Sequence, residues 1–462
     1  MRLIVLFSLL GVTAWSACAV KNPPPPADLL KSALTATPVQ PAWTGAAPVA
    51  GSVETDWIRT FGDPQLEALV EEGLRNNLDL QAAAYRVEAA AGLVVQARSL
   101  LYPQLSLIGG FGAVGRGDQD VFEKYGIVGE ASWELDLWGR VRAQAASATA
   151  SRQAVEADLL YARQSLAATI AKVWYQAITT ERLRLTAENG MKVYNELLHL
   201  VSVKKTVGSV GQQDVVLAGA DLDRARRRER EFSSSKQQVT RGLELVLGRY
   251  PSAELALAAD VAAVPPPVPD GLPAELLERR PDLVAAERRV AAAFHAIQSA
   301  KAARLPKIAL TASGGRSTND LFYLLGISPN FWQTGVGFLA PIFTGGQLRA
   351  QVDIATAEQR AALALFGQAA LRAFSDVETS LANERLLEDQ QRYLEGVVAQ
   401  ESEGLRLRQV RYKVGATDLL SVLDLQNRLL NAQLDLVVVR NERLANRIGL
   451  HLALGGGFAT AP

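Results

Sequence analysis

Residues 77–87 read NLDLQAAAYRV, and residues 280–290 read RPDLVAAERRV. The two stretches align without gaps, and the match continues downstream in the pairs Arg86 with Arg289, Ala97 with Ala300, and Pro103 with Pro306. After a shift of a few residues, Arg142-Ala143-Gln144 matches Arg349-Ala350-Gln351, and Val207-Gly208 matches Val414-Gly415. The sequence therefore predicts a tandem duplication, with one copy at about 64–250 and the other at about 272–454.

Two long spans of the chain lack proline, one between residues 103 and 251 and the other between residues 341 and 462. Because proline breaks helix interiors, both spans can hold long helices. Residues 141 to about 207 are rich in good helix formers, and residues 347 to about 413 are similar. Each would reach roughly 100 Å as one helix. Helices of this length need partners along their whole length, as in coiled coils or helical barrels.

Glycine follows each of these long helices: Gly208 and Gly211 in the first copy, and Gly415 in the second. A glycine just past a helix end fits the left-handed cap. A second helix is then expected to return, at 214 to about 247 and at 418 to about 454. Each copy is therefore predicted to contain a long helical hairpin.

A strand-like pattern lies between a shorter leading helix and the long helix of each copy. Residues 132–138 and 335–342 alternate between polar and apolar side chains, and residues 103–112 and 306–315 are glycine-rich strand candidates. Alternation fits a membrane β-barrel wall, with apolar side chains toward lipid; a small soluble β-hairpin layer is the alternative. Aromatic residues near the strand ends are typical of a membrane girdle: Trp133, Trp138, Phe331 and Trp332.

Four strands per chain are too few to close a barrel, and an open sheet edge cannot face lipid. Three chains would have to supply twelve strands between them. The predicted fold class is therefore mainly α with a β-barrel portion. In it, tandem-duplicated long helical hairpins accompany four strands that are shared in a barrel built by three chains.

The composition excludes several classes of function. The chain has 462 residues, in which 48 Lys and Arg balance 48 Asp and Glu, whereas a nucleic-acid binder would show a basic excess. Its histidines, His199, His295 and His451, lie far apart, and no Cys/His cluster has metal-ligand spacing. We find no nucleophile elbow, phosphate-cradling loop or metalloprotease motif. We therefore expect no enzyme, no metal and no cofactor.

The first 17 residues are typical of a secretory signal peptide, with Arg2 before an apolar run at 3–10 and small residues at 14–17. This segment is too short for a transmembrane helix, which needs about 20 apolar residues. No later stretch of that length lacks charges. A membrane crossing by the mature chain would therefore require a β-barrel.

Cys18 is the only cysteine, and it stands where a bacterial lipoprotein carries its acylated cysteine. The run Ser16-Ala17-Cys18 resembles the end of a lipobox, although Trp15 occupies a position where Leu is usual. Cleavage by ordinary signal peptidase after Ala19 is the alternative. A tether rich in Pro and Ala follows. We expect a covalent lipid on Cys18.

Several further blocks carry a family resemblance: the Pro-x-Leu-x-Leu strand starts at Pro103 and Pro306, Trp138-Gly139-Arg140, RYKVG at 411–415 and LSVLD at 420–424. In this order, and with the duplicated blocks, they resemble the TolC-like outer membrane efflux protein family. The similarity is to its lipoprotein branch, which is OprM/NodT-like. The resemblance covers residues 18 to about 455.

The resemblance implies a homotrimer with a twelve-stranded barrel in the outer membrane and a long α-helical barrel across the periplasm. The Pro-rich linker and the segment near Trp57 and Phe61 would help to build an equatorial layer. The implied partners are a periplasmic membrane-fusion adaptor and an inner-membrane transporter, commonly a proton-driven RND transporter. The implied function is passive conduction of drugs or other small toxic solutes to the exterior, with no nucleic-acid partner.

In this family the tube is closed at its periplasmic end by contacts near the hairpin tips. The matching positions are Tyr412 by the end of the long second-copy helix, Asp424 on the returning helix, and Asp214 at the corresponding turn of the first copy. The resemblance implies a latch in which the Tyr412 hydroxyl donates to Asp214. Asp424, repeated around a threefold axis, would form an acidic ring that favours cations.

Two residues depart from the pattern of some relatives: Thr417 stands in place of an Arg, and Ser421 in place of a further Asp. We therefore expect a weaker latch, or an acidic role shared by Asp418. A solvated polar group on a helix face is the alternative for each of these gate residues. The mixed-charge run at 224–231 is likewise interpreted first as a salt-bridged helix face, with adaptor docking second.

Two other functions compete with an efflux channel. A type I protein-secretion conduit is one, although such conduits usually lack a lipid-bearing cysteine; a periplasmic coiled-coil scaffold without a pore is the other. The sequence names neither the exported substrate nor the cognate adaptor and pump. The predicted division is 1–17 signal peptide, 18–63 tether and equatorial segment, 64–250 first repeat, 251–271 linker, 272–454 second repeat and 455–462 tail.

Overall fold

The computed structural model describes residues 20–35, 40, 42–45, 56–114, 122–258, 263–268, 276–318, 324 and 331–456. The chain divides into unit 1, with residues 1–38, 84–158 and 282–370, and unit 2, with residues 39–83, 159–281 and 371–462. The signal peptide, Trp15 and Cys18 lie outside the described residues, so what we expect of them stays a prediction.

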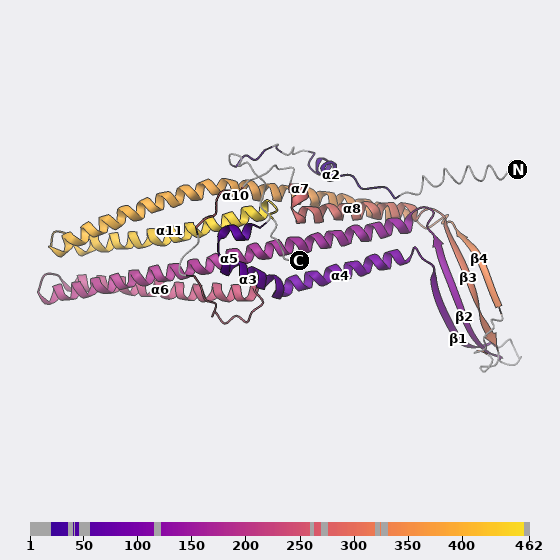
Figure 1. The fold of residues 1–462 in the computed structure, drawn as a ribbon, viewed down its shortest axis with the longest axis horizontal. Helices are drawn as coiled ribbons and strands as arrows, with labels where there is room; N and C mark the ends of the chain where they lie inside the picture. The colour runs from indigo at the N-terminus through magenta and orange to yellow at the C-terminus, as the bar shows by residue number, and fades with distance from the viewer. Residues whose placement is uncertain are drawn as a thin grey trace. The chain divides into compact units, whose positions relative to one another are not determined.

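The two copies have helices of equal length. The long helices α5 (Arg140–Thr206) and α10 (Gln347–Lys413) have 67 residues each, and the returning helices α6 (Gln212–Val246) and α11 (Leu419–Ala453) have 35 each. Figure 1 shows each returning helix beside the long helix that precedes it, so both predicted hairpins are confirmed. The other helices are α2 (Pro26–Ala33), η1 (Trp57–Phe61), α3 (Pro64–Asn76), α4 (Leu78–Ser99), α7 (Leu276–Arg279) and α8 (Pro281–Ala302).

The turn at each hairpin tip follows the same design. Gly208 has φ +76° and Gly415 has φ +79°, a left-handed conformation that costs glycine little. In the first copy, the Ser209 N–H donates to the Lys204 carbonyl at 2.9 Å; in the second, the Ala416 N–H donates to Arg411 at 2.8 Å. This is the Schellman cap, which satisfies carbonyls that the last helical turn leaves unpaired.

The described strands form one antiparallel sheet in the order β1-β2-β3-β4. They are β1 (Gln104–Val114), β2 (Phe122–Leu135), β3 (Lys307–Thr318) and β4 (Phe331–Leu339). Each copy supplies two strands, as the sequence predicts. Among the described residues, β1 and β4 pair with a neighbour on one side only, so the sheet has two free edges.

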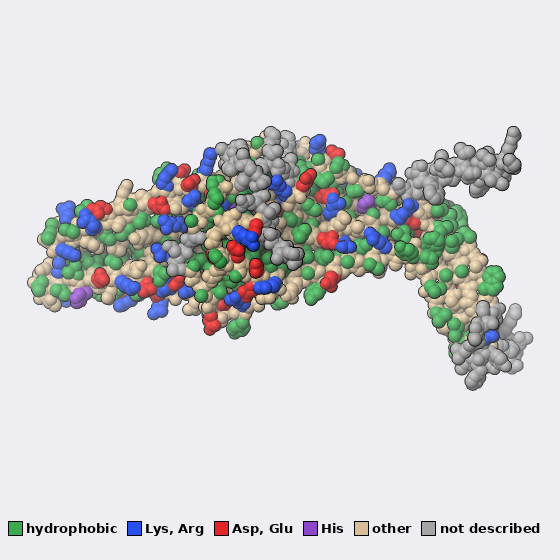
Figure 2. Space-filling model, viewed as in Figure 1, with side chains coloured by type: hydrophobic (Ala, Val, Ile, Leu, Met, Phe, Trp, Pro, Cys, Tyr) green, Lys and Arg blue, Asp and Glu red, His purple; other side chains and the backbone are tan. Residues whose placement is uncertain are grey.

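Register divides this sheet into an apolar face and a polar face, because directly paired residues share a face. The apolar face carries Leu107, paired with Gly129, and Leu310, paired with Trp133 and Val336. The polar face is lined by Ser106, Glu130, Ser132, Thr311, Ser313 and Gln333. Leu107 is 76% exposed and Val336 72% exposed. Hydrophobic side chains gather over the strands in Figure 2.

Two of the predicted strand ranges are wrong at their ends. Strand β2 begins ten residues before Ser132 and ends at Leu135, and β4 ends at Leu339 rather than at residue 342. Asp136 leaves the strand because its carboxylate caps α5, accepting the N–H groups of Val141 and Arg142 at 2.9 Å each. The alternating run at 132–138 therefore mixes the end of a strand with a helix cap.

The core of unit 2 gathers around η1. Trp57, which is 1% exposed, and Phe61 pack with Trp174 of α5, and Leu255 of the linker packs against the same cluster. The Trp174 indole donates to Asp63 at 2.8 Å, and the other oxygen of that carboxylate caps α3. The linker and the Trp57 segment thus share one core, and the equatorial layer that the resemblance implies stays a prediction.

His451 completes this core as a neutral ring. It stacks on Trp57 with ring centroids 5.3 Å apart and an interplanar angle of 15°. Burial, and secondarily the charge of Arg447, lowers the pKa of His451 to about 4. Neither ring nitrogen has a hydrogen-bond partner within the described part of the chain. The residue therefore acts here as an aromatic packing group.

Two buried side chains of opposite charge anchor the linker. Glu244 on α6 is 2% exposed, and its carboxylate accepts the backbone N–H groups of Ala253, Glu254 and Leu255 at 2.7, 3.0 and 3.2 Å. These bonds hold Ala253 at φ +63°, which is strained for a residue with a Cβ.

Arg447 on α11 is the second anchor, and it is also 2% exposed. Its guanidinium donates to the carbonyl of Pro265 at 2.6 Å, to the carbonyl of Pro266, and to Glu384 at 2.6 Å. A carboxylate thus holds one end of the described linker through its amides, and a guanidinium holds the other through its carbonyls.

Among the helices that the structure describes, none combines the length and the apolar composition that a bilayer crossing requires.

Replacing Glu244 with Ala should lower the free energy of unfolding by about 3 kcal/mol, because three buried N–H donors lose a charged acceptor. Chemical denaturation of the purified protein measures this change. Glu254→Ala is the matched control, since Glu254 is exposed and would leave its own N–H group bonded. Equal losses of unfolding free energy in the two variants would contradict the role of Glu244 as an anchor of the linker.

Candidate functional site at the hairpin tips

A lysine joins the two long helices near their ends. Lys204 lies in the last turn of α5, and its ammonium donates to the Tyr412 carbonyl of α10 at 2.7 Å. The same nitrogen lies 3.9 Å from the centroid of the Tyr412 ring. A cation over an aromatic face is attracted by the ring quadrupole, so the contact holds both the backbone and the side chain of Tyr412.

Tyr412 is buried, with 4% of its surface exposed, and its hydroxyl makes no hydrogen bond within the described residues. Burial, and secondarily the charge of Asp214, raises the pKa of Tyr412. Asp214 itself accepts the Gly211 N–H at 3.2 Å, which caps the start of α6. The hydroxyl is therefore an available donor near Asp214, and the bond between them stays a prediction.

Asp418 caps the start of α11 in the equivalent place. Its carboxylate accepts the Ser421 N–H at 2.7 Å and the Ser421 hydroxyl at 3.1 Å. These bonds, followed by the charge of Arg408, lower the pKa of Asp418. Arg408 also donates to the Thr417 hydroxyl at 3.3 Å. The two residues that depart from some relatives are thus both engaged within their own hairpin.

Asp424 lies six residues after Asp418 on α11 and is open to solvent, with 65% of its side chain exposed. Its ionic partner is Arg428, whose Nε lies 3.8 Å away and also 3.5 Å from Glu401. The arginine is itself exposed, so this contact offsets only part of the negative charge. Asp424 is therefore accessible to solvent, as is Asp418, whereas Tyr412 is buried.

Two further polar contacts, not predicted from the sequence, join the hairpins. The Tyr194 hydroxyl of α5 donates to Asn427 of α11 at 2.7 Å, and Arg228 of α6 donates to Asn431 at 2.8 Å. The two asparagines lie one turn apart on α11, so they face the same neighbours. Their partners are more than two hundred residues away in sequence, so no local sequence pattern could have revealed these contacts.

The charged run at 224–231 partly forms the salt-bridged helix face that we predicted first. Arg224 pairs with Asp221, Arg227 with Glu231, and Arg226 with Asp223 at 3.1 Å. Adaptor docking on this run stays a second interpretation.

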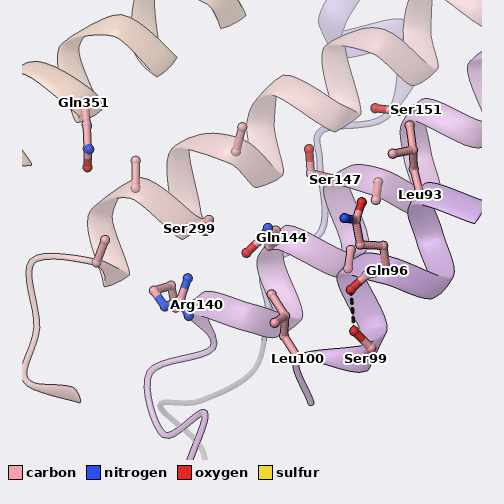
Figure 3. A pocket seen from close by; sticks show the side chains of 15 residues that line it. Leu93, Gln96, Ser99, Leu100, Arg140, Gln144, Ser147, Ser151, Ser299 and Gln351 are labelled. Carbon is pink, nitrogen blue, oxygen red and sulfur yellow. Dashed lines mark hydrogen bonds between the residues drawn. The ribbon is translucent and has the colours of Figure 1, made fainter. Parts of the chain in front are cut away.

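Unit 1 contains a hollow of about 940 Å³ between α4, α5, α8 and α10. Figure 3 shows that its labelled side chains are mostly uncharged and polar, with Gln96 from α4 and Gln144, Ser147 and Ser151 from α5. Arg140, at the end near the sheet, is paired with Glu134 at 2.9 Å. This lining offers hydrogen bonds from uncharged groups, and its one charged side chain is already paired.

The histidine, cysteine and carboxylate side chains of the described residues form no group of three or more able to hold a metal ion.

Comparison with known proteins assigns the family. The sequence profile of the outer membrane efflux protein family matches residues 69–249 and again 272–456, which are the two copies. The chain is 31% identical to the toluene efflux pump outer membrane protein TtgC of Pseudomonas putida, over 91% of this chain and 89% of that protein. It is also 31% identical to the pyoverdine export outer membrane protein OpmQ of Pseudomonas aeruginosa, over 98% of both chains.

A solved structure of the outer-membrane channel OprN has the same fold, with a TM-score of 0.84 and 27% identity. The match covers 91% of this chain and 98% of that one. Since both copies match the family profile and the fold matches nearly end to end, this chain belongs to the outer membrane efflux protein family.

Proposed function

We propose that this protein is the outer-membrane channel subunit of a tripartite efflux pump, in which three copies form one conduit for small toxic solutes. The observation that carries the proposal is the four-stranded sheet with one apolar face, one polar face and two free edges. Membership of a family of outer-membrane transport proteins supports it, and sets the chain apart from enzymes.

The sheet fits a wall between lipid and water. Its exposed apolar row, which includes Leu107 and Val336, suits the hydrocarbon, and the polar face suits an aqueous lumen. Backbone groups at a free edge cannot stay unpaired in lipid. Pairing β4 of one copy with β1 of the next would satisfy both edges, and three copies would close a ring of twelve strands.

The conduit would continue through the helices. The hollow lined by Gln96, Gln144 and Ser147 lies where α4 and α5 join β1 and β2, so it would extend the polar face of the sheet. Transport would be passive, since these side chains offer no reaction chemistry. The driving force would come from an inner-membrane transporter of the RND type, joined to the hairpin tips by a periplasmic membrane-fusion adaptor.

Sequence similarity to known relatives indicates a class of solute and no single solute. The chain is equally similar to a toluene pump protein and to a pyoverdine export protein, and these cargoes share little chemistry. Selection by the inner-membrane transporter accounts for this, because a wide polar conduit discriminates weakly. We therefore assign the class of small toxic solutes, drugs among them, and no single member.

A matched pair of lysine substitutions tests the membrane sheet. Leu107→Lys should sharply reduce the trimer recovered from the outer membrane, because a lysine at mid-membrane costs about 2–4 kcal/mol on a lipid-facing strand. Ser106→Lys, on the adjacent residue and the opposite face, should leave it nearly unchanged. Native mass of the detergent extract and conductance in planar bilayers measure assembly and pore formation. Equal effects of the two substitutions would reject the proposal. So would an unsubstituted protein that is monomeric and shows no conductance.

Lipid attachment at Cys18 is tested by the intact mass of the mature protein. We expect processing that leaves Cys18 as the first residue, with a diacylglycerol and a further acyl chain attached. The Cys18→Ser variant should lack this added mass. An unmodified Cys18, or a mature chain that begins after it, would refute the anchor.

The gate is tested by closed-state conductance. Asp214→Ala combined with Tyr412→Phe should raise it, because the predicted latch is lost. Lys204→Met should raise the frequency of opening by about tenfold, since it removes a charge-assisted bond that joins the two long helices. Lys205→Met is the control, because Lys205 contacts only Gln212 of its own hairpin among the described residues. Unchanged conductance in the double variant would end the latch interpretation.

A further inference from the structure

A second pocket in unit 1, of about 450 Å³, has a different chemistry from the polar hollow. We call it the arginine pocket; it is lined by Arg98 of α4, Arg142 of α5, and Arg288 and His295 of α8, and also by Pro23 and Leu101. Its α5 residues lie on the opposite side of that helix from Gln144 and Ser147, by the helical period. One side of α5 therefore faces a hollow whose single charged side chain, Arg140, is paired, and the other side faces a pocket lined by three arginines.

The charge of this pocket is only partly compensated. Arg142 pairs with Asp136 through Nε at 3.0 Å and donates from Nη2 to the Asp136 carbonyl at 2.9 Å. Arg288 pairs with Glu287 through Nε at 2.7 Å and donates from Nη1 to Gln153 at 3.5 Å. Nη1 of Arg142 and Nη2 of Arg288 are left for a ligand. Arg98 has no carboxylate partner among the described residues, and its Nη2 lies 3.5 Å from the Thr149 hydroxyl. The described residues that line the pocket include no Asp or Glu. The pocket thus offers net positive charge.

His295 adds an unused polar group inside the pocket. It is 9% exposed, and its Nδ1 has no hydrogen-bond partner among the described residues. Burial lowers the pKa of His295, so the ring is uncharged at neutral pH and can donate one N–H. A buried nitrogen without a partner is costly, and a ligand oxygen would remove that cost.

We propose that the arginine pocket binds the phosphate group of a membrane lipid, with guanidinium N–H groups and the His295 ring as donors. Arginine forks match the geometry of phosphate oxygens and form short charge-assisted bonds with them. The proposal rests on the proposed function, because an outer-membrane channel has headgroups beside the ends of its strands. Free phosphate has the same chemistry and is the other source to be distinguished.

The position of the pocket favours a lipid. The carbonyl of Leu101, a lining residue that lies just before β1, accepts the indole N–H of Trp133 at 2.9 Å. Arg142 lies in the first turn of α5, after β2. The pocket therefore adjoins the helical end of the sheet. Pro23 is five residues from Cys18, so an extended chain allows at most about 18 Å between the pocket and a lipid-bearing Cys18. Both features bring membrane headgroups within reach.

Calorimetric titration of the delipidated full-length protein, in a detergent without phosphorus, tests the site. The probes are dihexanoyl phosphatidylglycerol, dihexanoylglycerol and inorganic phosphate. We expect the phosphatidylglycerol to bind, and Arg98→Gln to weaken it by about tenfold. Arg98 is exposed, so its loss leaves the core intact. Arg152→Gln is the control, because this exposed α5 arginine pairs with Glu156 and lies outside the pocket.

The outcomes separate the claims. Equal binding of dihexanoylglycerol, or equal weakening by the control variant, overturns the phosphate site. Binding of inorganic phosphate alone, lost in Arg98→Gln, keeps a phosphate site and overturns the lipid as its source. Conductance of the same samples isolates the proposed function: absent binding with normal conductance rejects the pocket alone, and binding without conductance rejects the channel alone.

Discussion

The unpaired peptide groups along the outer edges of β1 and β4 constrain the rest of the architecture. In lipid, each missing backbone hydrogen bond costs several kcal/mol, so the edges of the proposed channel must pair with other copies. That pairing fixes the neighbours of each strand. Since α4 leads into β1, α5 follows β2, α8 leads into β3 and α10 follows β4, the order of strands also sets the order of helices in unit 1.

Sequence predicted the helical hairpins well because their signals are local and duplicated. Three signals place α5, α6, α10 and α11 within a few residues: the lack of proline, the glycine at each hairpin tip and the repeated sequence blocks. Strand β2 was harder, since Phe122 to Ala131 mixes charge and glycine and hides its alternation. Contacts such as Tyr194 with Asn427 and Lys204 with Tyr412 join residues far apart in sequence, which no spacing reveals.

Two acidic residues at the hairpin tips, Asp214 and Asp418, cap helices in addition to their predicted gating role. Asp214 and Asp418 each satisfy the start of a returning helix, where a carboxylate also complements the helix dipole. Removing either one therefore disturbs a helix end as well as any contact with a neighbour. Asp424 carries no such duty in the contacts described, so a change of conductance in its variants reports more directly on charge in the conduit.

The two linker anchors show that equivalent positions of the two repeats make different contacts. Glu244 and His451 occupy equivalent positions near the ends of the two returning helices, as do Thr240 and Arg447. Of these four side chains, Glu244 alone accepts hydrogen bonds from the described linker, and Arg447 alone donates to it. A protein with two copies of the first repeat would lack Arg447, so the carbonyls of Pro265 and Pro266 would lose their donor. A protein with two copies of the second repeat would lack Glu244, so the linker amides would lose their acceptor. The two repeats, although built alike, therefore make complementary contacts with the linker through these positions, and neither can replace the other there.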